Sequence, residues 1–424
     1  MRKDTLFRSV VLFVAAFAGC AAGFTSVASA EECNHEPITQ ELKMLIRNNP
    51  EIGELLQESI DKAAEANPDP VTNPVRTIED YYNYVDRVSK ALPQDILLNY
   101  KELPVHEQMI QGLCHIAFLV DQPLPELEDK GLFKNTIQYY EPFASWLRHF
   151  AVVWGQYLDT DASWNDRIYR EIKADPTFHL DDGTYESPSN WHTFNQFFSR
   201  YLSSPDQRPI ASPDDPTVVV SPADSVPQGV WPINDDSEIE VDGGLTIKTA
   251  TYYSVHDLLR SDSAYRDVFA GGVLTHNFLN VNDYHRYHFA VGGTVKEKGI
   301  IIQNTTVEIS WDGKQGEYVP TCSTGWQFTH THGYVVVDTG EYGLVALIPM
   351  GMSQVSSVNF EDSVKVGAEI KKGDMLGNFL FGGSDFVLLF QEEAGFKITA
   401  PMKNETEYEH ILMGEEYGRM GSTE

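Results

Sequence analysis

The sequence predicts an α+β fold, with a helical N-terminal domain over residues 31–180 and a mainly antiparallel β domain over residues 181–424. The chain has 424 residues, of which 42% are hydrophobic, so it can bury a sizeable core and two domains are expected. Apolar residues recur at helical spacing up to about residue 175. After Asp181-Asp182-Gly183, short apolar runs alternate with turn residues, as they do in antiparallel sheets.

Residues 1–30 have the features of a secretory signal peptide. Arg2, Lys3 and Arg8 form a basic start, an apolar run extends from Val10 to Phe24, and Ala28-Ser29-Ala30 supplies small residues for cleavage. A retained membrane anchor is less favoured, because the apolar run is short. We therefore expect cleavage near Ala30 and an exported protein, either periplasmic or secreted.

The charge of the chain restricts its partners. The formal net charge is −31, and removal of residues 1–30, which hold three basic residues and one acidic residue, takes it to −33. A chain this acidic repels nucleic acid and anionic lipid unless its basic residues cluster. We expect no nucleic-acid partner, and contact with a membrane would be peripheral.

The cysteines do not predict a disulfide framework. Cys33, Cys114 and Cys322 remain after signal cleavage, an odd number without a Cys-x-x-Cys pair. One disulfide among them could form in an oxidising compartment, and the sequence leaves the pairing open. Cys20 follows Phe17-Ala18-Gly19, which suggests lipoprotein processing as a weaker alternative because Phe17 fits that signal poorly.

The helical domain is predicted from apolar spacing and breakers. Glu41–Ala66 has a helical pattern, and the proline-rich segment Asn67–Pro74 ends it. Thr77 and Asp80 form a capping-box pattern that opens the next helix. Two further helices are predicted, over Val105–Val120 and Tyr140–Leu158.

The β domain begins with an aromatic stretch and a polar link. Trp191–Leu202 has an amphipathic helical pattern, and Ser203–Pro216 is rich in proline, serine and aspartate. Apolar runs typical of strands then follow at Thr217–Val220, Leu245–Thr249, Gly333–Val337, Leu344–Ile348 and Phe386–Phe390.

One stretch near the C-terminus carries a candidate nucleophile. Apolar runs flank Gly382-Gly383-Ser384-Asp385, where the glycines leave the Gly383 carbonyl uncrowded. The Ser384 hydroxyl could then attack the preceding peptide bond if a base lay nearby. A bulge or tight turn is the ordinary interpretation of such a break. The Gly-x-Ser-x-Gly nucleophile motif is excluded, because Phe386 replaces its last glycine.

Acid–base candidates occur at two other places in the β domain. Asp224 follows a predicted strand and a proline turn, and His285 and His288 lie three residues apart. Serine, histidine and aspartate can form a relay in which the carboxylate orients the imidazole and the imidazole deprotonates the hydroxyl.

Metal binding is the competing use of these histidines. His285, His288, His330 and His332 could supply nitrogen ligands, and Asp283 could supply oxygen. The sequence has no His-Glu-x-x-His motif or other familiar ligand spacing, so we expect no metal.

Several motifs in order resemble the phosphatidylserine decarboxylase family. They are Phe194–Arg200, Arg208-Pro209-Ile210, Ser221–Asp224, Asp283–His288, Lys372–Phe379 and Gly382-Gly383-Ser384. Each motif alone is weak, whereas their order and approximate spacing over residues 190–391 are specific. The helical domain more faintly resembles the extra N-terminal domain of a branch that includes fungal tryptophan decarboxylases.

This resemblance implies a zymogen that processes itself. Cleavage between Gly383 and Ser384 would leave a covalent pyruvoyl group, the expected cofactor, on residue 384, and both fragments would stay associated. Asp224, His285 and Ser384 match the self-processing triad of the family, and His288 matches its second active-site histidine. The resemblance implies a lyase that decarboxylates its substrate through a Schiff base. In that reaction His285 would return the proton, because it can titrate near neutral pH, and His288 would hold or polarise the substrate.

Two departures from the family pattern bear on processing and on the substrate. Asp385 replaces the usual serine or threonine, and its carboxylate could slow processing by repulsion or act as a local base. Leu347–Met352 also departs from the family pattern in a region that helps to shape the substrate pocket.

We expect a free L-amino acid as substrate. Phosphatidylserine, for phospholipid biosynthesis, is the alternative, and an inactive exported binding protein is a third possibility.

An aromatic group could bear on membrane contact. Trp191, Phe194, Phe197 and Phe198 could form an apolar docking patch. Packing into the core is the favoured interpretation of these four side chains.

Overall fold

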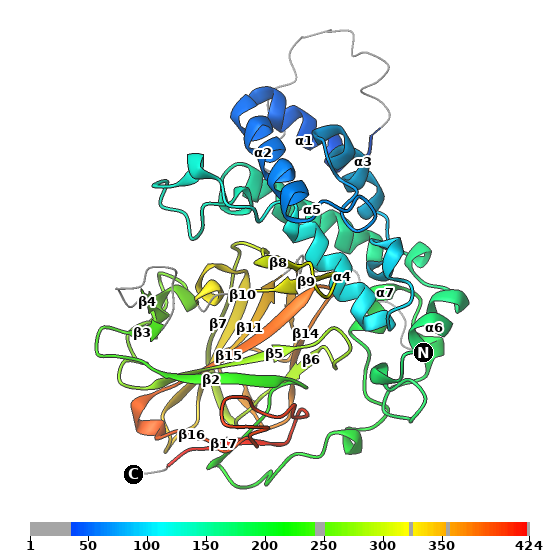
Figure 1. Ribbon diagram of the computed structural model, residues 1–424. Helices are drawn as coiled ribbons and strands as arrows, with labels where there is room; N and C mark the ends of the chain where they lie inside the picture. The colour runs from blue at the N-terminus through cyan, green and yellow to red at the C-terminus, as the bar shows by residue number, and fades with distance from the viewer. Residues whose placement is uncertain (1–34, 242–250, 322–324, 353–356, 422–424) are drawn as a thin grey trace, which may run out of the picture.

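The computed structural model describes residues 35–241, 251–321, 325–352 and 357–421. The predicted signal peptide, Cys20, Cys33, Cys322 and the predicted strand Leu245–Thr249 lie outside these residues. In the described ranges, the chain forms a helical region that leads into a mainly antiparallel β region, which confirms the predicted α+β class (Figure 1).

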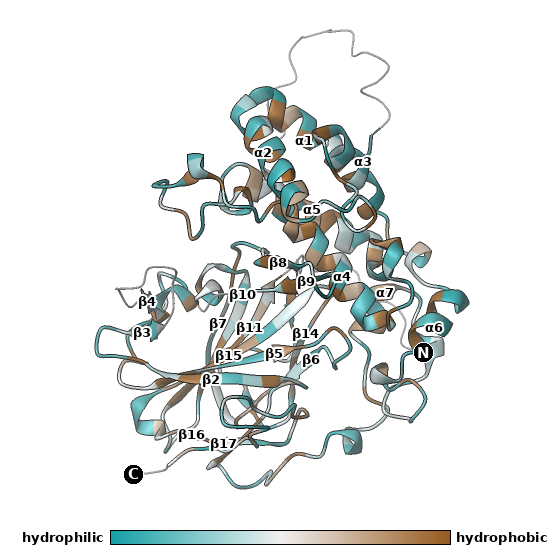
Figure 2. Ribbon diagram, in the orientation of Figure 1, coloured by the Kyte–Doolittle hydropathy of each residue, from teal (hydrophilic) through white to brown (hydrophobic). Residues whose placement is uncertain are grey.

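The α-helices in the described residues occur before residue 200. They are α1 Pro37–Asn48, α2 Pro50–Ala66, α3 Ile78–Val88, α4 Val105–Phe118, α5 Phe143–Leu158, α6 Asp166–Lys173 and α7 Phe194–Phe198. Helices α1, α2 and α3 each carry hydrophilic and hydrophobic residues, as expected of helices that cover a core (Figure 2). No helix in the described ranges has the length and apolarity needed to span a bilayer.

Local signals explain where these helices begin and end. The Thr77 hydroxyl accepts a hydrogen bond from the Asp80 backbone N–H at 3.1 Å, and the Asp80 carboxylate accepts one from the Thr77 N–H at 3.0 Å. This confirms the predicted capping box of α3. The single helix predicted over Glu41–Ala66 is instead two helices. Pro50 begins α2 because proline lacks an N–H and fits the first turn of a helix.

The aromatic stretch forms a shorter helix than predicted. Only α7, five residues long, is helical within Trp191–Leu202. Trp191 is 4% exposed, and Phe194, Phe197 and Phe198 are fully buried. These four side chains therefore pack in the core, as the favoured interpretation expects, and they do not form a docking patch.

The strands follow from residue 218 onward. In the described ranges they are β1 Val218–Val220, β2 Val226–Pro232, β3 Glu238–Val241, β4 Thr251–Ser254, β5 Val273–Leu279, β6 Arg286–His288, β7 Gly293–Ile301, β8 Ile309–Asp312, β9 Glu317–Pro320, β10 His332–Asp338, β11 Leu344–Met352, β12 Val358–Phe360, β13 Glu369–Ile370, β14 Met375–Phe379, β15 Gly383–Phe390, β16 Lys397–Ile398 and β17 Glu416–Arg419.

The largest sheet has the order β13-β7-β10-β11-β15-β5-β2, and all its pairs are antiparallel. Strand β15 is therefore flanked on both sides. The other sheets in the described residues are β1-β17-β16, β12-β14-β6, β3-β4 and β8-β9.

The two faces of β15 contribute to different cores. Phe386, Leu388 and Phe390 belong to a large core that also contains side chains of the helical region. Val387 and Leu389 point to the opposite face and belong to a smaller core. This alternation is the ordinary period of a strand that is buried on both faces.

A hairpin joins the two regions. Strands β8 and β9 pack against α4, where Gln111 accepts a hydrogen bond from the Tyr318 N–H at 2.8 Å and donates one to the Tyr318 carbonyl at 3.1 Å. The Ile309 N–H donates to the Asp121 carboxylate at 2.8 Å. The helical region and the main sheet therefore share one continuous apolar core.

Candidate active site

Ser384 lies inside a strand rather than in the predicted break. Strand β15 begins at Gly383, and Ser384 is paired with Gly351 of β11 and Leu279 of β5. The pairing with β11 runs from Phe390 to Gly383 without a bulge. The chain turns before the strand, at Gly382, whose φ of +147° would strain any residue with a side chain.

The Ser384 hydroxyl is buried without a hydrogen bond that would offset the cost of its desolvation. The residue has no exposed surface, and its Oγ has no hydrogen-bond partner among the described residues. An unpaired buried hydroxyl is costly, so it requires an explanation such as stored strain or a chemical role.

The His285 ring presents one free nitrogen. Its Nδ1 lies 3.0 Å from the carbonyl oxygen of Asp283. A carbonyl can only accept, so Nδ1 carries the proton and Nε2 carries the lone pair. Nε2 is buried and has no hydrogen-bond partner within the described ranges. Burial, and to a lesser degree the charge of Arg200, lowers the pKa of His285 to about 3, so the ring is neutral at ordinary pH. The expectation that His285 titrates near neutral pH is therefore not supported, because its ring is desolvated.

Aromatic contacts connect His285 with the segment that leads to Ser384. The His285 ring stacks on Phe198 with centroids 3.8 Å apart, and Phe198 contacts Phe381 at 5.0 Å. Phe381 also meets Trp154 of α5 at 5.6 Å. The Phe379 N–H donates to the His285 carbonyl at 3.0 Å. The helical region therefore contacts the segment that leads to Ser384.

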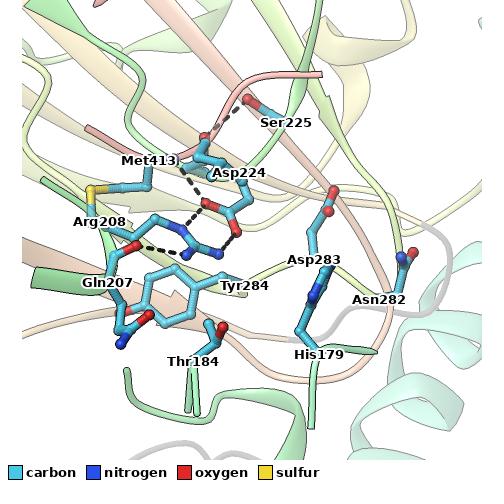
Figure 3. Close-up of polar contacts among 12 residues, drawn as sticks. His179, Thr184, Gln207, Arg208, Asp224, Ser225, Asn282, Asp283, Tyr284 and Met413 are labelled. Carbon is cyan, nitrogen blue, oxygen red and sulfur yellow. Dashed lines mark hydrogen bonds and ion pairs between the residues drawn. The ribbon is translucent and has the colours of Figure 1, made fainter. Parts of the chain in front are cut away.

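Asp224 forms a buried ion pair with Arg208. The guanidinium donates from Nε at 2.9 Å and from Nη2 at 2.6 Å, and the Met413 N–H donates to the same carboxylate at 2.8 Å (Figure 3). The two side chains are 8% and 3% exposed. Burial alone would lower the pKa of Arg208, but hydrogen bonds and charge from Asp224 raise it overall. The carboxylate is thus held in one orientation.

The charge of Asp224 acts on His288. The His288 Nδ1 faces the Gly373 carbonyl at 2.8 Å, and its Nε2 lies 3.2 Å from the Tyr284 hydroxyl. Burial lowers the pKa of His288 to about 4, whereas the Gly373 carbonyl and the Asp224 charge oppose this shift. The structure does not show the hydrogen bonds of the predicted Asp224–His285–Ser384 relay among the described residues. The His285 Nδ1 contacts the Asp283 carbonyl instead of Asp224, and the His285 Nε2 and the Ser384 hydroxyl have no hydrogen-bond partner in that part of the chain.

Asp385 points away from the Ser384 side chain. The two residues are adjacent on β15, so their side chains lie on opposite faces of the sheet. The Asp385 carboxylate accepts a hydrogen bond from the His276 Nε2 at 2.7 Å, and both residues are buried. The expectation that this carboxylate would lie beside the ester is therefore not supported, because the strand period separates it from the hydroxyl.

The histidines considered as metal ligands contact backbone carbonyls. His330 Nε2 lies 2.8 Å from the Thr306 carbonyl, and His332 Nδ1 lies 2.7 Å from the His330 carbonyl. Within the described ranges, no three or more side chains of histidine, cysteine, aspartate or glutamate gather as metal ligands would.

Three neighbours of the site carry roles that the sequence did not predict. They are Arg208, which holds Asp224, Tyr284, which contacts His288, and His276, which contacts Asp385. Of these three contacts, only the one made by Arg208 had a signal in the sequence. The Arg208-Pro209-Ile210 motif could have been assigned to a nearby carboxylate such as Asp224. The partners of Tyr284 and His276 depend on the tertiary structure.

Comparisons with known proteins find relatives that are named as decarboxylases. The sequence model described as phosphatidylserine decarboxylase matches residues 194–419. A protein named decarboxylase iboD, from Amanita muscaria, is 27% identical over 271 residues, which cover 57% of this chain and 75% of that protein. A phosphatidylserine decarboxylase proenzyme from Clostridium botulinum strain Hall is 28% identical over 279 residues, covering 64% and 85%. Phosphatidylserine decarboxylase proenzyme 2 from Oryza sativa subsp. japonica is 30% identical over 206 residues, covering 48% and 30%.

Proposed function

Because the chain belongs to the phosphatidylserine decarboxylase family and is a carboxy-lyase, we propose that it cuts itself between Gly383 and Ser384 and forms a pyruvoyl group from Ser384. We further propose that the mature enzyme removes the α-carboxylate of a free L-amino acid. One observation carries the proposal. The Ser384 hydroxyl and the His285 Nε2 are both buried and lack hydrogen-bond partners among the described residues. A buried polar atom without a partner calls for an explanation, and a chemical role is one.

The proposed self-cleavage uses groups that the chain supplies. The Ser384 hydroxyl adds to the Gly383 carbonyl carbon, the C–N bond breaks, and an ester forms. Elimination releases a Gly383 carboxylate and leaves an unsaturated residue 384, which water converts into the ketone with loss of ammonia. His285 is the proposed base for the hydroxyl proton. Its low pKa keeps Nε2 unprotonated but makes it a weak base, so we expect slow cleavage.

The residues around Ser384 fit a pyruvoyl group at that position. When present, this group supplies a ketone that captures the substrate amine and withdraws the electrons left by carbon dioxide. Residue 384 is buried between β11 and β5, which limits the access of bulk water to the position of the ketone. In our proposal His285 returns the proton to the α-carbon, and His288, held by Gly373 and Tyr284, orients the substrate.

Two observations support a small soluble substrate. Trp154 of the helical region packs on Phe381, three residues before Ser384, so the helical region takes up space beside the site. The net charge of −31, or −33 without residues 1–30, opposes docking to anionic lipid. The names of the rice and Clostridium relatives favour phosphatidylserine as the second candidate.

Mass spectrometry tests the processing step. The intact mass of purified wild-type protein should reveal two chains divided before residue 384, and Ser384→Ala should give one chain. Asp262→Ala, which changes an exposed ion pair with Arg260, is a matched control that should be cut normally. Cleavage of the Ser384→Ala variant at the same bond would contradict the mechanism.

A substrate panel tests the second half of the proposal. Carbon dioxide release should be measured with free L-amino acids, including aromatic ones, and with phosphatidylserine vesicles at equal amine concentration. We expect turnover with an amino acid. Formation of phosphatidylethanolamine at an enzymatic rate, without turnover of any amino acid, would replace our substrate with the lipid.

Export is a separate part of the proposal. It is based on the basic, apolar and small-residue pattern of residues 1–30. N-terminal sequencing of the protein from its native host should begin at Glu31. A mature chain that begins at Met1 in the cytosolic fraction would contradict it.

A further inference from the structure

A row of three hydrogen-bonded polar side chains lies next to the bond that we propose is cut, on the face of the sheet opposite to the Ser384 side chain. It consists of Gln327, His276 and Asp385. The His276 Nε2 lies 2.7 Å from the Asp385 carboxylate, and its Nδ1 lies 3.3 Å from the Gln327 side-chain nitrogen. These three residues are 7% exposed or less, among apolar neighbours such as Val387 and Leu389.

The direction of each hydrogen bond is fixed by its neighbour. The Gly325 N–H donates to the Gln327 side-chain oxygen at 3.0 Å, which directs the amide nitrogen toward His276. An amide nitrogen can only donate, so the His276 Nδ1 accepts and its Nε2 carries the proton. A neutral His276 therefore donates to Asp385, and the carboxylate is the final acceptor of the row.

The position of Asp385 gives this row its significance. His276 lies on β5, which pairs with β15 along seven residues from Ser384 to Phe390. Asp385 is the first residue after position 384, and His276 faces Val387 across the ladder, so the side-chain contact is diagonal. It adds a link from residue 385 to β5 beyond the backbone ladder.

We propose that Asp385 is a positioning residue that tethers the chain end created by self-cleavage, so that residue 384 stays in the sheet and in place for catalysis. This inference rests on the proposed function. Before cleavage, β15 is held by the covalent chain on both sides, so the tether adds little. After cleavage, residue 384 becomes a terminus, and chain termini fray unless they are tied down.

The tether predicts a difference between cut and uncut protein. The variants Asp385→Ala and Asp385→Asn should be made in the wild-type chain and in the uncut Ser384→Ala chain. Asp385→Ala removes the acceptor, whereas Asp385→Asn keeps an oxygen that can accept from His276. Backbone hydrogen exchange over residues 385–388 is the main measurement, and intact mass reports how much of each sample is cut.

We expect exchange over residues 385–388 to rise about tenfold in cut Asp385→Ala and to change little in its uncut counterpart. Cut Asp385→Asn should keep most of the protection. For the cut Asp385→Ala enzyme, kcat should fall about tenfold while KM stays within about twofold, because position 384 is misplaced whereas His288, which we propose orients the substrate, is unchanged.

The possible failures are distinguishable. Equal loss of protection in cut and uncut Asp385→Ala would mean that the pair only stabilises the fold, and it would overturn the tether. Equal damage by Asp385→Asn and Asp385→Ala would overturn a tether made by this hydrogen bond. A wild-type chain that is never cut would overturn the proposed function as well, whereas the first two results leave it standing.

Discussion

Trp154 of α5 meets Phe381 edge-on, with ring centroids 5.6 Å apart and an interplanar angle of 81°, three residues before Ser384. The contact joins the helical region to the segment that we propose is cut. Trp154 is 1% exposed, and its indole N–H donates to the Ala91 carbonyl at 2.9 Å. The helical region therefore packs on the segment that precedes Ser384.

Trp154→Ala should destabilise the protein and slow self-cleavage. Loss of a buried tryptophan costs about 3–5 kcal/mol, and the resulting space would loosen Phe381. Denaturant unfolding and a time course of intact mass measure the two effects. Trp154→Phe, which keeps an aromatic ring, should cost less in both. Normal cleavage kinetics in Trp154→Ala would disconnect the helical region from processing.

His285→Ala and His288→Ala should separate the roles of the two histidines. His285 has the unpartnered nitrogen, so its removal should block cleavage or slow it by about a hundredfold. His288 has partners at both nitrogens, so we expect its variant to be cut but to decarboxylate poorly. The fraction cut after a fixed time and the kcat of the cut enzyme provide the readout. If only His288→Ala stayed uncut, the base would be His288, which lies in the field of Asp224.

The buried histidines should make the fold sensitive to acid. Burial lowers the pKa of His115 and His285 to about 3 and that of His288 to about 4. The unfolded chain protonates these rings near pH 6.5, whereas the folded chain keeps them neutral. The contribution of these rings to stability is therefore greatest above pH 6.5 and falls as the pH drops toward 4, by up to about 1.4 kcal/mol per pH unit for each ring. Asp121, whose pKa burial raises to about 7, acts in the opposite direction.

Denaturant titrations at several pH values between 7 and 4.5 measure this slope. His115 is remote from the proposed chemistry, since it contacts Tyr84 and Asn73 within the helical region. His115→Gln should therefore flatten the slope without altering the pH dependence of cleavage. A slope that is the same in His115→Gln and in wild type would show that His115 does not contribute.

Arg208→Gln should harm the protein far more than the equivalent change at the surface. It would leave the Asp224 carboxylate buried without its cation, which costs about 3–5 kcal/mol. Arg260→Gln breaks a similar two-bond pair with Asp262, in which both side chains are more than half exposed, and should cost about 1 kcal/mol or less. Unfolding curves of the two variants provide the comparison. Equal costs would mean that the Asp224 pair contributes little.

The parts of the fold that local chemistry determines could be predicted from the sequence. The capping box at Thr77 and Asp80 involves residues three positions apart, and the strands at Leu344 and Phe386 are short apolar runs with clear ends. The extent of β15 was less accessible. Gly383 and Ser384 have weak strand propensity, but pairing with both β11 and β5 holds them in the ladder.

The candidate residues could be found from motifs, but their contacts could not. His285 and Ser384 were predicted as site residues, and each has a buried polar atom that lacks a hydrogen-bond partner within the described ranges. The partner of Asp224 is 16 positions away, and that of Asp385 is 109 positions away. Such pairs depend on tertiary packing, and spacing patterns between residues a few positions apart cannot predict them.

The location of β15 between β11 and β5 has a consequence for the refolding of the enzyme. If the bond before Ser384 is cut as proposed, residues 384–424 become a separate polypeptide. Its strand β15 pairs with β11 and β5, and its strand β17 pairs with β1, and these three neighbours belong to the other polypeptide. Once this protein is denatured, recovery would require two molecules to meet again by diffusion. Refolding of the cut enzyme would then depend on protein concentration, whereas folding of the uncut chain would not.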